Sequence, residues 1–141
     1  QIFSPDAQHL KTIQVAGPRI LRVHQKTGAI YVQHVGRVEG RSVERFTKFV
    51  SFDNPVEEFH VDGISSQAMA VDSWSAKPRL WLAGEPKVVN ERGVAERYTV
   101  RIYEEEGKSL RVLRDFDQEG RKESGVNYIG FAGDYFVAQR A

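Results

Sequence analysis

The chain has 141 residues, of which 40% are hydrophobic and 28% are charged, a balance typical of a folded domain. Its formal charge is +1 and no long run of one sign occurs, so the sequence predicts neither a nucleic-acid-binding surface nor a membrane-surface helix. It contains no cysteine, which excludes disulfides, thiolate metal sites and cysteine nucleophiles. No apolar run approaches the roughly 18 residues that span a bilayer, and we therefore expect no membrane span.

Residues 1–18 form the least regular part of the sequence. The run Ser4-Pro5-Asp6 is a turn signal, and residues 10–15 are suited to one short strand. We expect this segment to be irregular and to precede the first repeating unit. The chain starts at Gln1 rather than Met, which suggests a processed, excised or incompletely traced polypeptide and leans towards a periplasmic or secreted protein.

Residues 19–63 predict one unit of four antiparallel strands joined by short turns. The turn Lys26-Thr27-Gly28 separates the first two strands, and Asp53-Asn54-Pro55 separates the last two. Between the second and third strands we expect a glycine-rich polar loop over residues 36–42. The four strands are expected at 20–24, 29–35, 44–52 and 56–61.

The same pattern returns in a second unit over residues 64–125. The run Glu44-Arg45-Phe46-Thr47 recurs as Glu96-Arg97-Tyr98-Thr99, 52 positions later (96 − 44). The offset grows by two at each step, as small insertions in successive turns would produce, because turns tolerate insertions better than strands do. The other matched segments are 20–24 with 68–72, 30–32 with 80–82, and 56–59 with 110–113.

Residues 126–141 predict the start of a third unit. Strand-like runs at 128–131 and 135–137 flank the turn signal Gly133-Asp134, and the second run lies 55 positions after 80–82 (135 − 80). The polar residues 117–125 before them are expected to form an extended loop or one helical turn.

A repeat of about 50 residues with several short strands is typical of a β-propeller blade. The sequence therefore predicts an all-β fold of about two and a half four-stranded antiparallel β-propeller blades, within a larger or multi-chain propeller. Closed propellers have roughly four to eight blades, so the missing blades would come from a longer polypeptide, from copies of this chain or from other chains. A β-sandwich or open barrel is the alternative fold, which the repeat disfavours.

The first hairpin of each unit carries a resemblance to a known family. An apolar strand ends in a polar residue, the turn Lys26-Thr27-Gly28 follows, and Ile30-Tyr31-Val32 begins the next strand. This pattern, over roughly residues 19–140, resembles the blades of NHL-type and related six-bladed propellers, including the gluconolactonase-like group. The resemblance implies a propeller that is either a metal-dependent hydrolase, a lyase or a binding module. It carries no catalytic residue over, since no pore signature of the hydrolases is matched.

His24 and Asp72 occupy equivalent positions at the ends of the first strands of adjacent units. If both side chains converge on a central channel, they are suited to bind a divalent metal with waters, or to act as a general base and its orienting partner. The alternative is that each begins a turn and faces solvent. No pair of histidines has the close spacing of a zinc finger or zinc helix.

Other residues are candidates for contact with a ligand or partner. The connection between the two units contains four of them, and it predicts a turn in which Gly63 adopts a positive φ. A tryptophan in the loop of residues 73–78 is a candidate for a surface contact, whereas Trp81 is expected to pack in the core between units. The run Glu104-Glu105-Glu106 is expected at a solvated hairpin tip. The candidate contact residues are Asp62, Ser65, Ser66, Gln67 and Trp74.

Two functions are compatible with these features. The first is a binding and assembly module, a propeller segment that completes a ring with other protein chains or with copies of itself. The second is a subunit of a propeller enzyme, a hydrolase or oxidoreductase with a metal or cofactor in the central channel. The sequence identifies no substrate, ligand or cofactor, because a propeller is a scaffold that hosts many functions.

Overall fold

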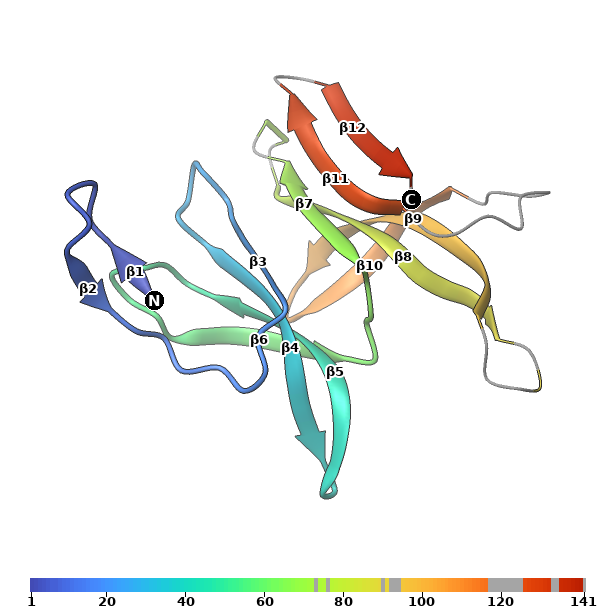
Figure 1. The fold of residues 1–141 in the computed structure, drawn as a ribbon, viewed down its shortest axis with the longest axis horizontal. Helices are drawn as coiled ribbons and strands as arrows, with labels where there is room; N and C mark the ends of the chain where they lie inside the picture. Colours follow the sequence, from blue (N-terminus) through green and yellow to red (C-terminus); the bar gives the residue numbers. More distant parts are fainter. Residues whose placement is uncertain are drawn as a thin grey trace.

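The computed structural model describes residues 1–72, 74–75, 77–89, 91, 95–116, 126–132 and 135–140. Within these ranges the chain forms β-strands and no helix, which confirms the predicted all-β class (Figure 1). The strands are β1 (Ile2–Phe3), β2 (His9–Lys11), β3 (Ile20–Val23), β4 (Ile30–Val38), β5 (Arg41–Phe49), β6 (Glu57–Asp62), β7 (Ala68–Asp72), β8 (Arg79–Val89), β9 (Ala95–Glu106), β10 (Ser109–Phe116), β11 (Val126–Ala132) and β12 (Tyr135–Arg140).

The strands form two four-stranded and two two-stranded antiparallel sheets. Sheet 1 has the order β3-β4-β5-β6 and sheet 2 the order β7-β8-β9-β10, so each is a meander of consecutive strands. The hairpins β1-β2 and β11-β12 form the two small sheets. The two four-stranded units expected from the repeat are therefore present, each with its strands in chain order.

The connection between β4 and β5 differs from the expected polar loop. β4 continues through Gly36 to Val38, and only Glu39 and Gly40 separate it from Arg41 in β5. Both turn residues have positive φ, 49° and 79°, which gives a tight turn that matches the twist of the flanking strands. The prediction of a loop over 36–42 was wrong because Gly36 was taken as a loop residue. Its missing side chain instead leaves room for Arg45, whose Nε would lie 2.5 Å from a Cβ at this position.

Sheets 1 and 2 stack face to face. We call the side of each sheet that faces its successor along the chain the back face, and the opposite side the front face. The back face of sheet 1 packs on the front face of sheet 2. Successive side chains along a strand point to opposite faces, so only every second residue of each strand enters this interface. The buried residues of this interface are Ala29, Tyr31, Phe46, Phe59, Ile64, Met69, Leu80, Leu82 and Tyr103.

The same stacking continues beyond sheet 2. Small residues and Val100 form a second cluster on its back face, and Trp81 packs against them with its ring stacked 6.2 Å from that of Phe116. Trp81 is thus partly buried against the core of its own sheet, and its expected packing between two units stays a prediction. β11 lies against β7 and β8 on this side, and β3 lies beside β7 (Figure 1). The first strands of successive units therefore lie next to one another.

The N-terminal segment is more regular than expected. β1 pairs with β2 around the Ser4-Pro5-Asp6 turn, and the strand lies at His9–Lys11 instead of residues 10–15. The described part of the chain has no helix long and apolar enough to cross a membrane. The predictions for residues 117–125 and for Gly133-Asp134 lie outside the described residues.

Candidate functional site

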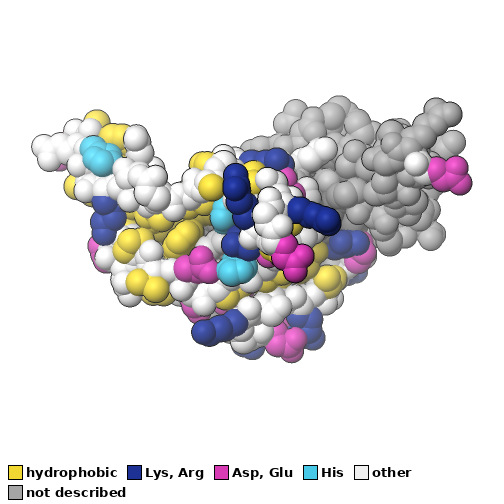
Figure 2. All heavy atoms as spheres, turned by 90° about the horizontal axis from the view of Figure 1, so that it is seen from below, with side chains coloured by type: hydrophobic (Ala, Val, Ile, Leu, Met, Phe, Trp, Pro, Cys, Tyr) yellow, Lys and Arg dark blue, Asp and Glu magenta, His cyan; other side chains and the backbone are white. Residues whose placement is uncertain are grey.

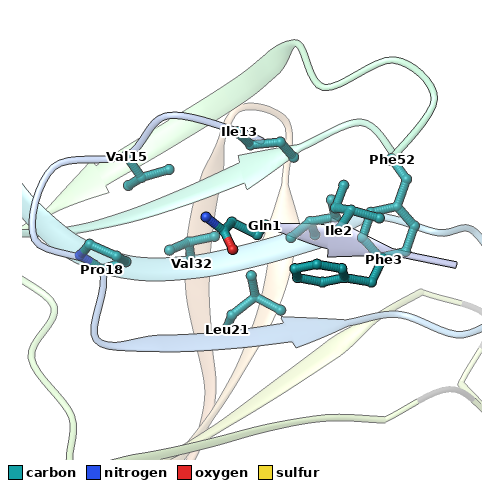
Figure 3. Close-up of a pocket in the computed structure, with 10 residues that line it drawn as sticks. Gln1, Ile2, Phe3, Ile13, Val15, Pro18, Leu21, Val32 and Phe52 are labelled. Atoms are coloured by element: carbon teal, nitrogen blue, oxygen red, sulfur yellow. The ribbon is translucent and has the colours of Figure 1, made fainter. Parts of the chain in front are cut away.

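The front face of sheet 1 carries an apolar pocket of about 390 Å³. Ile30 and Val32 form its floor, Leu21 lies at its rim, and Ile2 and Phe3 of the β1-β2 hairpin form its outer wall (Figure 3). Figure 2 shows hydrophobic side chains gathered in the hollow beside this hairpin. The remaining residues that line the pocket are Gln1, Ile13, Val15, Pro18 and Phe52.

This pocket is open to solvent at its rim while its floor is buried. Ile30 is 1% exposed, whereas Leu21 and Phe3 are 52% and 53% exposed. On an ordinary surface, exposed apolar residues are scattered singly. Here several large, half-exposed apolar side chains surround one hollow, and a contiguous patch of this kind marks a binding site for a ligand or another protein surface. Sequence reasoning missed this pocket, because it assigned the N-terminal segment no structure that could wall it.

His24, predicted to lie at a channel or in solvent, is buried directly after β3. It is 3% exposed, and its Nδ1 lies 2.8 Å from Thr27 Oγ1, within the tight turn that its backbone closes with Gly28. Its Nε2 is buried and has no hydrogen-bond partner among the residues that the structure describes. Burial lowers the pKa of His24 and nearby Lys26 lowers it further, while Asp72 and Glu105 act in the opposite direction. Folding therefore favours the neutral form of the imidazole.

Asp72 ends β7 at the position that the repeat matches to His24. It is 1% exposed, and its carboxylate accepts hydrogen bonds from the Ser75 amide at 3.2 Å and the Ser75 hydroxyl at 2.8 Å. The carboxylate thus closes the turn after β7, as Asp commonly does. Both predicted site residues are buried rather than solvent-facing. The described residues include no group of three His, Asp or Glu side chains able to hold a metal ion, so a metal at His24 and Asp72 stays a prediction.

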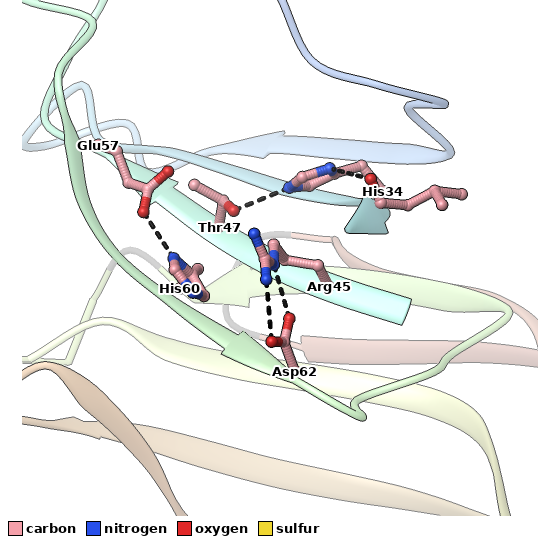
Figure 4. A network of polar contacts seen from close by, with 7 residues as sticks. His34, Arg45, Thr47, Glu57, His60 and Asp62 are labelled. Carbon is pink, nitrogen blue, oxygen red and sulfur yellow. Dashed lines mark hydrogen bonds and ion pairs between the residues drawn. The ribbon is translucent and has the colours of Figure 1, made fainter. Parts of the chain in front are cut away.

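The candidate contact residues between the sheets are largely engaged within the protein. Arg45 holds Asp62 through two hydrogen bonds of 2.6 and 2.9 Å, and this pairing lowers the pKa of the Asp62 carboxyl (Figure 4). Ser66 is buried, and its hydroxyl donates to Gln33 Oε1 at 2.6 Å. Gly63 has φ 85°, as predicted for this turn.

The other candidate contacts lie nearer the surface. Gln67 is exposed, and its backbone N–H donates to the Ala83 carbonyl. Its side chain lies against Gly84, in the space that a Cβ at that position would fill. Ser65 is half-buried. Trp74 is 43% exposed, which leaves it accessible to a partner. None of these residues lines the apolar pocket.

A charged cluster that the sequence did not reveal lies between the two sheets. Glu105 of β9 accepts a hydrogen bond from the Tyr31 hydroxyl at 2.6 Å, and its other oxygen lies 2.8 Å from Lys48 Nζ. Lys48 also lies 3.1 Å from Glu58. Burial, and then this hydrogen bond to Glu105, raise the pKa of the Tyr31 phenol. The expectation that Glu105 lies in a solvated tip was wrong, because alternation along β9 directs it to the front face of sheet 2.

The histidines on the strands have structural partners. His34 Nδ1 donates to the Val35 carbonyl at 3.1 Å, so its Nε2 accepts from the Thr47 hydroxyl at 2.8 Å (Figure 4). His60 Nδ1 lies 2.6 Å from Glu57 on the same strand. These contacts hold strands in register and leave no convergent catalytic arrangement of His34 and His60.

We expect the chain to lose stability as the pH falls below about 6.5, the ordinary pKa of histidine. When the pKa of a base is lower in the folded chain than in the unfolded chain, its contribution to the free energy of unfolding is complete at pH values above the unfolded-state pKa. The chain loses that contribution as the pH falls towards the folded value, because the unfolded chain takes up the proton first. Urea unfolding midpoints between pH 8 and pH 5 measure this loss. His24→Gln should flatten the profile and Lys26→Ala should make it shallower, whereas an unchanged slope in His24→Gln would contradict the role of this residue.

Comparison of the chain with models of protein families, with curated proteins and with solved structures gave no match. The function of the chain has therefore to be inferred from its own repeat and its own surfaces.

Proposed function

We propose that this chain is a segment of a β-propeller that acts as a binding and assembly module, completing a ring with further sheets. Two full blades would be sheets 1 and 2, and β11-β12 would begin a third. The proposal is supported by the back-to-front stacking of successive meanders and by the contacts of β3 with β7 and of β7 with β11. In a propeller the first strands of successive blades surround the central axis in this way.

The observation that carries the proposal is the apolar front face of sheet 1. The repeat matches Ile30 and Val32 of this face with Leu80 and Leu82 of sheet 2, each 50 positions later (80 − 30). Leu80 and Leu82 are 0% exposed because the back face of sheet 1 covers them. The equivalent Ile30 and Val32 are also buried, 1% and 3% exposed, because Ile13, Val15 and Phe52 pack against them. Among the described residues, however, no second sheet covers this face, so a pocket remains beside the half-exposed Leu21. A back face of another sheet is the surface that its shape and apolar character fit.

Light scattering and native mass spectrometry of the purified chain test this proposal. We expect a particle heavier than the 16.0 kDa of one chain, because burial of the front face is favourable by roughly 25 cal/mol for each Å² of apolar surface. Leu21→Asp should return the mass to 16.0 kDa, since it places a charge in the contact. Val38→Asp is the matched control: Val38 is 41% exposed and does not line the pocket, so its assembly should persist. A wild-type mass of 16.0 kDa at every concentration would contradict the assembly role.

A further inference from the structure

We infer that the β1-β2 hairpin of one copy and the β11-β12 hairpin of a second copy of this chain combine into one four-stranded sheet that covers the front face of sheet 1. This inference rests on the proposed function and names the partner as a second copy of the chain. Each of the two hairpins would then be half of a blade.

The β1-β2 hairpin has the sequence position of the outer half of a blade. β2 (His9–Lys11) lies 50 positions before residues 59–61 of β6 (59 − 9), and β1 lies 46 positions before the end of β5 (49 − 3). These spacings are 6 and 4 positions shorter than the offsets of 52 and 54 between the third and fourth strands of the two full units (52 − 46 and 54 − 50). β2 also leads directly into β3, as β6 leads into β7. By its position in the sequence, β1 corresponds to the end of the third strand of a blade, and β2 corresponds to the fourth strand.

The β1-β2 hairpin also has the spatial position of an outer half. Ile2 and Phe3 face the front of sheet 1 across the pocket, just as Phe59 and Val61 of β6 pack over the front of sheet 2. Lys11 fastens the hairpin there, because its Nζ donates to the Phe52 carbonyl at 2.6 Å. The pocket occupies the adjoining space over β3 and β4, where the inner half of the same blade would lie.

The β11-β12 hairpin has the complementary position of an inner half. β11 lies beside the first strand of sheet 2 and follows β10 in the chain, as β7 follows β6. Among the described strands, β12 pairs only with β11 and β1 pairs only with β2. Each strand of these two hairpins therefore has one edge with unpaired backbone groups, and such edges associate by forming a shared sheet. The edges of β1 and β12 are the two that would meet in the order β11-β12-β1-β2.

Two copies are the number that closes a ring by this exchange. Each copy contributes sheet 1, sheet 2 and the equivalent of one combined sheet, so two copies give six blades (2 × 3) and three copies give nine (3 × 3). Closed propellers have roughly four to eight blades, which selects the pair. In this pair β11-β12 of each copy would cover the pocket of the other, and the half-exposed Leu21 would become buried.

Disulfide cross-linking between two single-cysteine variants tests the exchange, since the natural sequence has no cysteine. Phe3→Cys in β1 is mixed in turn with Tyr135→Cys, Val137→Cys and Gln139→Cys in β12, and the mixture is oxidised. Neighbouring strands bring paired residues within the Cα separation of about 4.4–6.8 Å that a disulfide needs. Ile2→Cys replaces Phe3→Cys if the latter does not assemble, and Val38→Cys is the control because it lies at the β4-β5 turn.

We expect a covalent product of 32.0 kDa (2 × 16.0) from at least one β1 and β12 combination and none from the Val38 control. A mixture of single-cysteine chains yields this product only between two copies. A particle heavier than 16.0 kDa that forms no β1-β12 cross-link would overturn the exchange and leave the assembly function intact. A particle of 16.0 kDa would overturn both.

Discussion

Replacing Tyr31 by Ala is expected to lower the free energy of unfolding by about 4 kcal/mol, the cost typical of removing a buried aromatic ring. Tyr31 is 0% exposed at the centre of the interface between the sheets, where its ring lies 5.9 Å from that of Phe46. The truncation leaves a cavity between two preformed sheets, and it also removes the donor to Glu105. Neither sheet can collapse far into that space, because each is held by its own backbone ladder.

Urea unfolding of the Leu21→Asp background measures this loss, because association would otherwise add to the apparent stability. Tyr31→Phe is the matched control, since it keeps the ring and removes only the hydroxyl. We expect Tyr31→Phe to cost about 1.5 kcal/mol, the lower range for a hydrogen bond to a charged group. A loss below about 1 kcal/mol for Tyr31→Ala would show that the ring is not in a packed interface, and the stacking of sheets 1 and 2 would then be wrong.

Replacing Lys48 by Met is expected to cost about 2–3 kcal/mol. Lys48 is 8% exposed and is the cation shared by Glu105 and Glu58. Met matches its length and apolar stem but leaves the Glu105 carboxylate without its counter-charge in a largely desolvated site. Removal of one member of a fully buried pair costs about 3–5 kcal/mol, and the partial access of water to Glu105 reduces that figure here.

A double-mutant cycle separates the ion pair from the loss of packing. Glu105→Gln retains an acceptor for the Tyr31 hydroxyl and removes the charge. We expect Glu105→Gln to cost at least about 1 kcal/mol less in the Lys48→Met background than in the wild-type background, because no charge is then left unpaired. Additive losses would mean that Lys48 and Glu105 do not interact across the sheets.

The repeat made the fold of each unit predictable from the sequence. Alternating apolar residues in strands and the turn residues at Lys26-Thr27-Gly28 and Asp53-Asn54-Pro55 specify hairpins locally, so the strands of both sheets lie close to their expected positions. The matching of Trp81 with Tyr31 also indicated that both aromatic rings pack against a core, which the structure shows for each. Strand alternation and turns depend on residues that are close together in the sequence, so they can be recognised from the sequence alone.

The rest depends on contacts between distant segments. Glu105 belongs to a run of three glutamates and reads as solvated, yet its partners Tyr31 and Lys48 lie 74 and 57 positions away. The repeat matched His24 with Asp72, but the burial of both side chains is decided by the sheets packed around them. The pocket was missed for the same reason, since it exists only where the hairpin at Ile2–Phe3 returns to the front of sheet 1.

Small-angle scattering of the purified chain, with the mass and radius of gyration taken from the same sample, tests the central claim most directly. Two copies closed into a ring of six blades give 32.0 kDa (2 × 16.0) and a compact particle of 282 residues (2 × 141). For a compact protein of that length the radius of gyration is about 19 Å. The account predicts both values, with the radius independent of concentration. A mass of 16.0 kDa, or a radius that grows with concentration as in an open stack of sheets, would contradict it.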